Sequence, residues 1–456
     1  MTKWARPVIR HRAQRGHLSS PVPLWRQLQA AASVLAAVRR GESATPAIAR
    51  VQAELRPAAQ SLAFHVLRQL GRAEALRAQL AKRAPPPAAD ALLCTALALA
   101  WREDGAPYPA FTLVDQAVEA AKRSPETRNQ QAFINACLRR FLRERDALVA
   151  ATDADPVARW NHPRWWIARL KHDHPDGWQA ILEASNRPGP MTLRVNTHRI
   201  SREPLRELLA AGHVASTPVG LHGLMLERPL PVEAIPGFKE GLWSVQDAGA
   251  QLAAQLMAPG LPPNARVLDA CAAPGGKTAH LCELKPDARV LALDVDPVRC
   301  ERIHQNLQRL GLHAHVQAAD AADTGSWWNG ESFDAILLDA PCTASGIVRR
   351  HPDVRWLRRE SDVAQLAAQQ KRLLTALWPL LKPGGHLVYC TCSVFRAEGE
   401  GQIAAFLAHN RTAVLRPAPG HLLPGSPGKD GPVRDNRLGD HDGFYYALLD
   451  KARDGV

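Results

Sequence analysis

The sequence has no hydrophobic run long enough to cross a membrane. The apolar stretch ALLCTALALA at residues 91–100 is far shorter than the roughly 20 residues that a membrane-spanning helix needs. The N-terminal segment MTKWARPVIRHRAQRGHLSS is basic, but it lacks the apolar stretch and the small-residue cleavage site of a secretory signal. We therefore expect a cytoplasmic protein with no membrane partner.

Cysteine is scarce, with eight residues in a chain of 456. Thiols are normally reduced in the cytoplasm, so a disulfide framework is not expected. The sequence also has no C-x-x-C pair, and this absence argues against a bound metal. Each cysteine is therefore expected to be a buried structural thiol or a nucleophile.

Two nucleotide-binding patterns are absent as well. The Gly-rich segment VLDACAAPGGK at residues 267–277 matches neither G-x-G-x-x-G nor G-x-x-x-x-G-K-[ST]. A dinucleotide and a nucleoside triphosphate are therefore disfavoured, and with them a nicotinamide-dependent oxidoreductase. The glycines still allow the backbone to approach a ligand closely, beside the electropositive N-terminus of a predicted helix.

Acidic residues are missing from the first 41 residues, which hold eight Lys and Arg side chains. Residues 1–150 contain 23 basic and 11 acidic residues, so they carry +12 of the formal charge of +13. A positive field at one end of a chain suits a polyanion such as RNA or DNA. The alternative is an ordinary solvated surface rich in arginine, and charge alone does not decide between the two.

The spacing of apolar residues divides the chain into an arm and three domains. Residues 1–24 are predicted to be a basic arm, and residues 25–150 an all-helical domain, because apolar residues recur there every three or four positions. Residues 155–240 are predicted to be a small α+β domain. From residue 241 to 456 strands and helices alternate, which predicts an α/β domain with a doubly wound, mostly parallel sheet.

The small domain combines aromatic and basic side chains. Trp165 and Trp166 follow Arg164 directly, and Arg194 lies in the predicted strand MTLRVN. Aromatic rings and guanidinium groups stack on unpaired nucleic-acid bases. Packing in the core or between domains is the alternative for the two tryptophans.

Acidic side chains end successive strands of the α/β domain, where ligands of such sheets bind. Asp294, Asp320 and Asp339 each come at the end of a predicted strand. Carboxylates at these places suit the ribose hydroxyls of a nucleoside, or a cationic group such as a sulfonium. For each aspartate taken singly, capping of the following helix is the alternative.

Two cysteines also follow strand ends, Cys342 after DAP and Cys392 after LVYCT. A thiolate at such a rim adds to an electron-poor carbon. Addition at C6 of cytosine would make C5 able to attack a methyl sulfonium, whereas methylation of an exocyclic nitrogen typically uses a D/N-P-P-Y/F strand end, which is absent here. Cys390 is predicted to be buried. The remaining cysteines are predicted to be packing residues: Cys94, Cys137, Cys271, Cys282 and Cys300.

At these residues the sequence resembles the RNA cytosine-C5 methyltransferases of the Sun/Nol1/Nop2 family. The resemblance covers essentially all of residues 241–456 through the segments PGFKEGLWSVQDAGAQLAA, VLDACAAPGGKTAHL, ALDVDPVRCERI, DAPCTASGIVRRHPDVRWLRR, KPGGHLVYCTCSVF and DGFYYALL. It implies a Rossmann-type domain that binds S-adenosylmethionine. The residues that it implies for the cofactor are Cys271, Ala272, Ala273, Pro274, Gly275, Gly276, Lys277, Asp294, Asp320 and Asp339.

The same resemblance implies a role for each strand-end thiol. Cys392 would attack C6, Cys342 would assist release of the methylated product, and Asp339 would also hold the cytosine ring at N3. The segment FRAEGE at residues 395–400 departs from the P-E-E-N that the family often has. Helix entry after the nucleophile is therefore an open point. Residues 411–440 are expected to form a mobile surface loop.

The N-terminal helices resemble the NusB-like RNA-binding domain through VDQAVEAAK and FINACLRRF, and LRVNTHRIS resembles the family's RRM-like domain. A NusB-like domain ahead of this methyltransferase indicates small-subunit (16S) ribosomal RNA as the partner, and a monomer is expected. The alternatives are a cytosine in tRNA or in large-subunit rRNA, or a non-catalytic RNA-binding factor.

Overall fold

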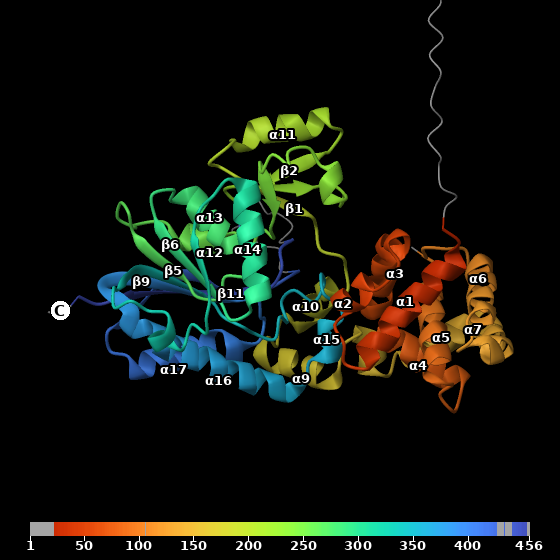
Figure 1. Ribbon diagram of the computed structural model, residues 1–456. Coiled ribbons are helices and arrows are strands. Elements are labelled where there is room, and N and C mark those ends of the chain that lie inside the picture. Colours follow the sequence, from red (N-terminus) through yellow and green to blue (C-terminus); the bar gives the residue numbers. More distant parts are fainter. Residues whose placement is uncertain (1–21, 105, 426–432, 434–439, 454–456) are drawn as a thin grey trace, which may run out of the picture.

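The computed structural model describes residues 22–104, 106–425, 433 and 440–453. A helical domain lies at one end of the molecule, and a small sheet lies beside a larger domain at the other end (Figure 1). Residues 1–21 of the predicted basic arm lie outside the described residues. In the part of the chain that is described, no helix is long and apolar enough to cross a membrane.

The N-terminal domain is all-helical, as predicted. It consists of α1 (Leu24–Arg39), α2 (Ala44–Ala49), α3 (Arg56–Arg68), α4 (Leu70–Leu80), α5 (Pro87–Ala100), α6 (Ala110–Arg123) and α7 (Gln131–Thr152), with 3-10 turns η1 (Ala53–Leu55) and η2 (Arg128–Gln130). The apolar run of residues 91–100 is the buried part of α5, which contacts α1, α4, α6 and α7. A helix that is apolar on all sides is here the centre of a bundle.

The middle of the chain forms two parts. Helices α8 (Pro156–Trp160), α9 (Arg164–Asp173) and α10 (Trp178–Ser185) pack around Phe395 and Val363 of the C-terminal domain. An antiparallel sheet follows, in the order β2-β3-β1-β4, made of β1 (Thr192–Val195), β2 (Ser216–Val219), β3 (Gly223–Leu226) and β4 (Trp243–Val245), with α11 (Arg202–Ala211) and the 3-10 turn η3 (Val232–Ala234). Strand β4 pairs with β1 although it lies beyond the predicted domain boundary at residue 240.

The base-stacking interpretation fails for two of its four residues. Trp166 is 1% exposed and Arg194 is 0% exposed, so neither presents a surface to an RNA base. Trp165 packs against Trp166 and Phe395, with ring centroids 5.2 and 6.0 Å apart. Packing, the alternative for the tryptophans, holds fully for Trp166, while Trp165 is partly buried against the same cluster and Arg164 is exposed.

The C-terminal domain is a seven-stranded sheet with helices on both faces, as predicted. Its strands, in the spatial order β10-β11-β9-β8-β5-β6-β7, are β5 (Arg266–Asp269), β6 (Arg289–Asp294), β7 (His315–Ala318), β8 (Phe333–Asp339), β9 (Leu381–Thr391), β10 (Ala413–Leu422) and β11 (Phe444–Lys451). Strands β5 to β9 are parallel, and β10 and β11 run antiparallel at one side.

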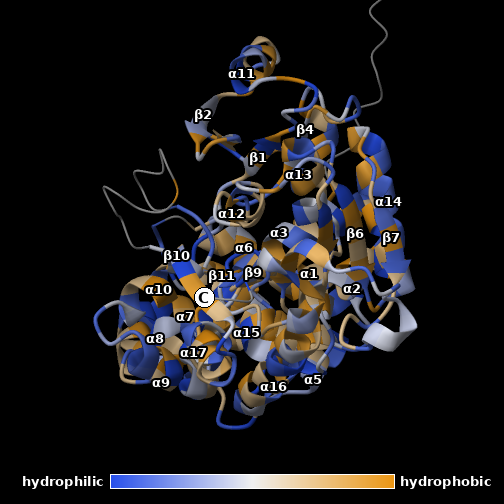
Figure 2. Cartoon of the chain, turned by 90° about the vertical axis from the view of Figure 1, so that its left-hand side faces the viewer, coloured by the Kyte–Doolittle hydropathy of each residue, from blue (hydrophilic) through white to orange (hydrophobic). Residues whose placement is uncertain are grey.

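Two helical layers enclose this sheet (Figure 1). One consists of α12 (Leu252–Met257), α13 (Gly276–Leu284) and α14 (Pro297–Leu310), and the other of α16 (Glu360–Leu377) and α17 (Glu400–His409), with short turns η4 (Thr324–Ser326), η5 (Trp378–Leu380) and η6 (Arg396–Glu398). Alternate residues of β8 enter the two cores, Leu337 on the first side and Ile336 on the second. Helix α14 presents hydrophobic and hydrophilic residues on different sides (Figure 2).

The expectation of a surface loop over residues 411–440 is wrong in its first part. Residues 413–422 form β10, which pairs with β11 through a register shift between Arg416 and Gly420. The strand lies at the edge of the sheet, and Val414 and Leu415 are about half exposed, so its alternation of apolar residues is weak. Residues 426–432 and 434–439 lie outside the described residues.

The short helix α15 (Val354–Leu357) joins the C-terminal domain to the helical domain (Figure 1). Trp356 packs against the core of the helical domain, and its Nε1–H donates to the Leu67 carbonyl at 2.8 Å. Asp353 accepts hydrogen bonds from the Ser43 hydroxyl at 3.1 Å and the Ala44 N–H at 2.9 Å. The segment that starts at Cys342 therefore ends against the helical domain.

Candidate active site

The carboxyl ends of the parallel strands meet at one edge of the sheet. Strands β5, β6 and β8 end at Asp269, Asp294 and Asp339, and β9 ends one residue before Cys392. A cleft of about 390 Å³ lies at this edge. Its lining includes the predicted site residues Cys271, Ala273, Pro274, Asp294, Asp320, Asp339, Cys342 and Cys392.

The rest of the Gly-rich turn shapes the cleft without lining it. The Ala272 N–H donates to the Leu293 carbonyl of β6 at 2.7 Å. Gly275 has φ +93°, and a Cβ at this position would lie 3.0 Å from Cγ2 of Ile303. Glycine is needed there both for the left-handed backbone and for the close approach of α14. Gly276 begins α13, so the helix N-terminus faces the turn.

Asp294 is fixed at the cleft by backbone and side-chain donors. Its Oδ2 accepts the Ala273 N–H at 3.2 Å, and its Oδ1 lies 3.3 Å from Nη1 of Arg299. The same guanidinium donates to the Ala273 carbonyl at 2.9 Å. Val295, the next residue, lines the cleft and is 70% exposed. The arrangement places an oriented carboxylate beside an apolar surface.

Asp320 lies further along the same edge. Its Oδ1 accepts the Ala322 N–H at 3.0 Å, and its Oδ2 pairs with Nη2 of Arg372 at 2.8 Å. Partial burial opposes ionisation, but the hydrogen bonds from Arg372 and Ala322 outweigh it and lower the pKa of Asp320. The capping alternative does not hold for Asp320, because the bond from Ala322 closes a turn and the following helical turn η4 has Asp323 at its N-cap. Asp320 lines the cleft.

Lys277, predicted as part of the cofactor turn, points to Asp339. Its Nζ lies 2.5 Å from Oδ2 of Asp339, while the Cys390 thiol donates to Oδ1 at 3.4 Å. Burial disfavours the Lys277 ammonium, yet the Asp339 charge outweighs burial and raises the pKa of Lys277. Burial, and then Asp339, raise the pKa of Cys390. Cys390 is 0% exposed, which confirms its predicted burial, and it contacts the carboxylate as a thiol.

Cys342 and Cys392 are neighbours in space. Their Sγ atoms are 3.4 Å apart, and both residues line the cleft. The hydrogen bond with Cys392 and burial raise the pKa of Cys342, which favours the thiol form of Cys342 while the two sulfurs are in contact. The Gly346 N–H donates to the Cys392 carbonyl at 2.9 Å. Two loops therefore bring the two predicted catalytic sulfurs together.

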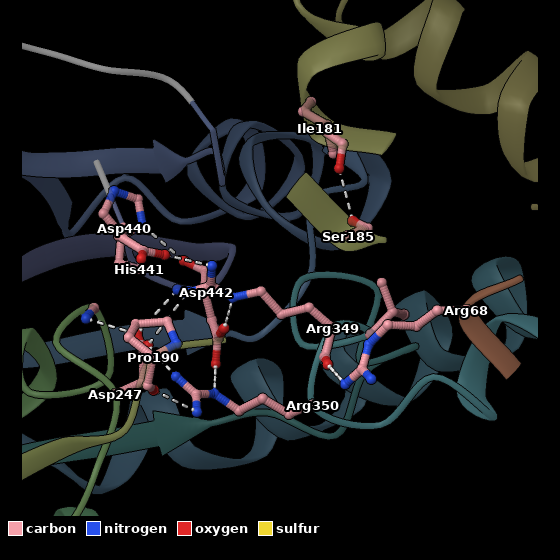
Figure 3. Close-up of polar contacts among 12 residues, drawn as sticks. Arg68, Ile181, Ser185, Pro190, Asp247, Arg349, Arg350, Asp440, His441 and Asp442 are labelled. Carbon is pink, nitrogen blue, oxygen red and sulfur yellow. Dashed lines mark hydrogen bonds and ion pairs between the residues drawn. The ribbon is translucent and has the colours of Figure 1, made fainter. Parts of the chain in front are cut away.

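Two arginines anchor the loop that follows Cys342 (Figure 3). Arg349 and Arg350 each donate from Nε to one oxygen of Asp442 at 2.5 Å. Arg350 also pairs with Asp247 at 2.8 Å, close to the end of β4. The Arg349 carbonyl accepts from the Arg68 guanidinium of the helical domain at 2.5 Å. The ion pairs tie the loop to Asp442 and Asp247, and the hydrogen bond from Arg68 ties it to the helical domain.

Asp269 was not among the predicted site residues, although it ends β5 in the way that the other aspartates end their strands. It is 0% exposed, and its Oδ2 accepts from the Thr278 hydroxyl at 2.7 Å. Burial raises its pKa to about 7. Its position at the end of a predicted strand, directly before ACAAPGGK, could have identified Asp269 from the sequence.

Comparison with known proteins agrees with this architecture. Residues 255–450 match the family described as 16S rRNA methyltransferase RsmB/F. Residues 162–233 match its ferredoxin-like domain, and residues 26–143 match the NusB family. The chain is 40% identical over 435 residues to ribosomal RNA small subunit methyltransferase B of Vibrio cholerae, covering 92% of this chain and 96% of the relative. The chain belongs to the RsmB/F methyltransferase family.

Further members of this family and two solved structures are also similar. Ribosomal RNA small subunit methyltransferase B of Pseudomonas syringae pv. tomato is 42% identical, over 92% of this chain and 96% of that protein. The crystal structure of PH0851 matches 93% of this chain and 99% of its own, with 25% identity and a TM-score of 0.73. A methyltransferase homologue from Pyrococcus horikoshii matches 65% of this chain and 98% of its own, with 29% identity and a TM-score of 0.55.

Membership of the RsmB/F family makes this chain a methyltransferase. Two alternatives considered for the sequence, a nicotinamide-dependent oxidoreductase and a non-catalytic RNA-binding factor, are therefore set aside. The resemblance of the N-terminal helices to NusB is confirmed. The middle domain, expected to be RRM-like, matches a ferredoxin-like domain, which is a small α+β fold.

Proposed function

We propose that this RsmB/F methyltransferase methylates C5 of a cytosine in small-subunit ribosomal RNA through a covalent bond from Cys392 to C6. The observation that carries the proposal is the pair of thiols at the cleft, with Sγ atoms 3.4 Å apart. Methylation of an exocyclic nitrogen needs no thiol, whereas C5 methylation needs one sulfur to activate the ring and a base to complete the reaction.

The residues of the cleft fit S-adenosylmethionine as the methyl donor. Asp294 ends β6 with its carboxylate held by the Ala273 N–H and Arg299, which suits the two hydroxyls of a ribose. Val295 offers an exposed apolar surface beside it for the adenine ring. Asp320 and the turn from Cys271 to Gly276 complete the binding residues. When bound, S-adenosylmethionine supplies the electrophilic methyl group.

Within the active site, each cysteine of the thiol pair carries out one step of the reaction. The Cys392 thiolate forms a bond to C6, and the electron pair of the C5=C6 bond becomes available at C5 for methylation. Once Cys392 is bonded to C6, Cys342 no longer shares a hydrogen bond with that thiol and releases its own proton to solvent. The Cys342 thiolate then accepts the C5 proton, the C5–H electron pair re-forms the C5=C6 bond, and the C6–sulfur bond breaks and returns its electrons to Cys392. Asp339 orients the ring at N3, and Lys277 keeps this carboxylate in place.

Three observations support small-subunit rRNA as the substrate. The relatives from Vibrio cholerae and Pseudomonas syringae are named for small-subunit rRNA. A NusB-family domain precedes the catalytic domain, and residues 1–150 carry nearly all of the excess positive charge. The target base must leave its stack to reach a thiol at the cleft.

Single substitutions test the covalent chemistry. Cys342→Ala should accumulate RNA bound to the protein under denaturing conditions, and Cys392→Ala should abolish both the adduct and methyl transfer. Cys137→Ala, a thiol of the helical domain, is the matched control and should behave like the wild type. Full methyl transfer by the Cys392→Ala variant would refute the mechanism.

The substrate is tested in a deletion strain. Bisulfite sequencing of its total RNA should show the loss of one 5-methylcytosine in 16S rRNA, restored by the wild-type chain and not by the Cys392→Ala variant. Loss of the mark in tRNA or large-subunit rRNA instead would refute the assigned substrate while leaving the chemistry in place.

A further inference from the structure

Glu398 is a buried carboxylate for which the proposed chemistry has no role. It closes the short turn η6 in the segment FRAEGE and is 0% exposed. Helix α17 begins at Glu400, directly after Gly399 and without a side-chain cap. Arg396, Ala397 and Gly399 depart from the family pattern. The helix entry therefore does not explain why a charged side chain is buried at position 398.

Four hydrogen-bond donors surround this carboxylate. Oε1 accepts the Thr343 N–H at 2.8 Å and the Gln370 Nε2–H at 3.2 Å. Oε2 accepts the Ser393 hydroxyl at 2.6 Å and the Thr343 hydroxyl at 2.5 Å. The Glu398 carbonyl in turn accepts the Tyr389 hydroxyl at 2.9 Å, which fixes the residue itself.

Among the described residues, no ion pair includes Glu398, and the groups that act on its ionisation are hydrogen-bond donors: Ser393, Thr343 and Gln370. Burial raises the pKa of Glu398, and the donors from Ser393 and Thr343 oppose this rise. A buried acceptor with four donors is strongly oriented, because each donor would lose its partner if the carboxylate moved.

Three of the four donors come from the two loops that carry the catalytic thiols, and the fourth, Gln370, lies on α16. Thr343 directly follows Cys342, and Ser393 directly follows Cys392. Both hydroxyls reach the same oxygen, Oε2, so the carboxylate bridges the loops one residue away from each sulfur.

We infer that Glu398 is a positioning residue that sets the distance and orientation of the Cys342 and Cys392 thiols. The inference rests on the proposed function for its catalytic consequence. Formation of the adduct needs only Cys392 at C6, whereas release needs Cys342 placed correctly against that same adduct. Loss of the bridge should therefore impair release more than adduct formation.

A first experiment uses the protein alone and does not depend on the proposed function. Diamide takes two hydrogens and two electrons from a pair of thiols, forms the S–S bond and becomes the corresponding hydrazine. The rate of Cys342–Cys392 disulfide formation, followed by peptide mass spectrometry, therefore reports how well the sulfurs face each other. Glu398→Gln keeps the shape of the side chain but replaces one acceptor oxygen by an NH2 group, which cannot accept the hydrogen bonds that this oxygen received.

We expect Glu398→Gln to slow this disulfide by about tenfold, the effect of one lost hydrogen bond to a buried charge. Glu400→Gln, which changes an exposed carboxylate two residues away, should leave the rate unchanged. If Glu398→Gln does not fold, Thr343→Val removes one of the Oε2 donors and should slow the reaction in the same direction. Wild-type rates in the folded variants would overturn the inference.

A second experiment measures catalysis. The ratio of trapped RNA adduct to methylated product should rise about tenfold in Glu398→Gln, whereas general damage to the fold would lower both quantities together. If Cys342→Ala traps no adduct, the proposed function fails whatever Glu398 does. If Cys342→Ala traps the adduct and Glu398→Gln keeps the wild-type ratio, the positioning role alone is refuted.

Discussion

A buried ion pair between Arg194 and Glu283 ties the small sheet to the catalytic domain. Both side chains are 0% exposed. The Arg194 guanidinium contacts both carboxylate oxygens, at 3.0 Å from Nε and 2.6 Å from Nη2. Its Nη1 donates to the Gly276 carbonyl at 2.6 Å, where α13 follows the Gly-rich turn. The ion pair therefore also holds the backbone of the Gly-rich turn, which belongs to the proposed cofactor site.

Arg194→Met should destabilise the protein by about 3–5 kcal/mol, because the apolar stem is kept while the Glu283 carboxylate is left buried without its partner. Burial already raises the pKa of Glu283, against the opposing charge of Arg194, so removal of Arg194 leaves the burial penalty uncompensated. Urea unfolding followed by circular dichroism measures the loss. The double substitution Arg194→Met with Glu283→Leu should recover most of it, since no buried charge remains.

A matched control exists on the surface of the same domain. Arg206 and Glu203 form an i, i+3 pair on α11 at 2.8 Å, with side chains 47% and 54% exposed. Arg206→Met should change the free energy of unfolding by less than about 1 kcal/mol. If Arg194→Met has an effect as small as this control, burial of the Arg194–Glu283 pair does not govern the stability of this interface.

Two further substitutions test local features of the active site. Burial raises the pKa of Asp269 from 3.8 to about 7. Between these values the folded protein keeps a proton that the unfolded chain has released, so the free energy of unfolding falls as the pH rises, by up to about 4 kcal/mol. Asp269→Asn should remove this slope in urea unfolding, and equal slopes in both proteins would contradict the assignment. Gly346→Ala should destabilise the protein by about 1–3 kcal/mol and reduce methyl transfer, because the new Cβ would lie 2.0 Å from the Gly443 carbonyl. Gly325→Ala, where a Cβ meets nothing within 4 Å, should change neither quantity, and equal effects of the two substitutions would show that this contact is unimportant.

Sequence patterns predicted the parts of the site that follow the backbone. Alternating strands and helices fix a parallel sheet, and the ends of parallel strands share one edge. Asp294 and Asp339 end their strands and Cys392 directly follows its own strand, so the three residues converge at that edge. Cys390 could be predicted as buried from the two-residue period of the same strand.

Side-chain partners across domains could not be predicted in this way. Arg194 looked like an RNA contact because its partner, Glu283, lies 89 residues away on α13. Lys277 belongs to the turn by sequence but points to Asp339 on another strand. Strand β10 escaped detection because an edge strand buries little and loses the apolar alternation that marks a strand.

The segment RRHPDVRWLRR, residues 349–359, shows how charge in a sequence differs from charge at a surface. It contains five arginines, a composition that suggests a contact with RNA. Arg349 instead forms an ion pair with Asp442, and Arg350 forms one with Asp247. Arg355 is 0% exposed and donates to the carbonyls of Asn161 and Ser185, at 3.2 and 2.6 Å.

Arg358 completes this internal use of charge, since its guanidinium donates to the Cys342 and Thr343 carbonyls at 3.3 and 3.1 Å. The chain from Cys342 to Asp353 has no regular helix or strand to hold it. Arginine is suited to this task because its planar fork of donors satisfies several acceptors at once. Four of the five arginines therefore make internal contacts around the loop that carries the second thiol, and only Arg359 is exposed. The excess basic charge of the chain lies instead in residues 1–150, which is where the proposed RNA substrate would find positive charge that this segment does not offer.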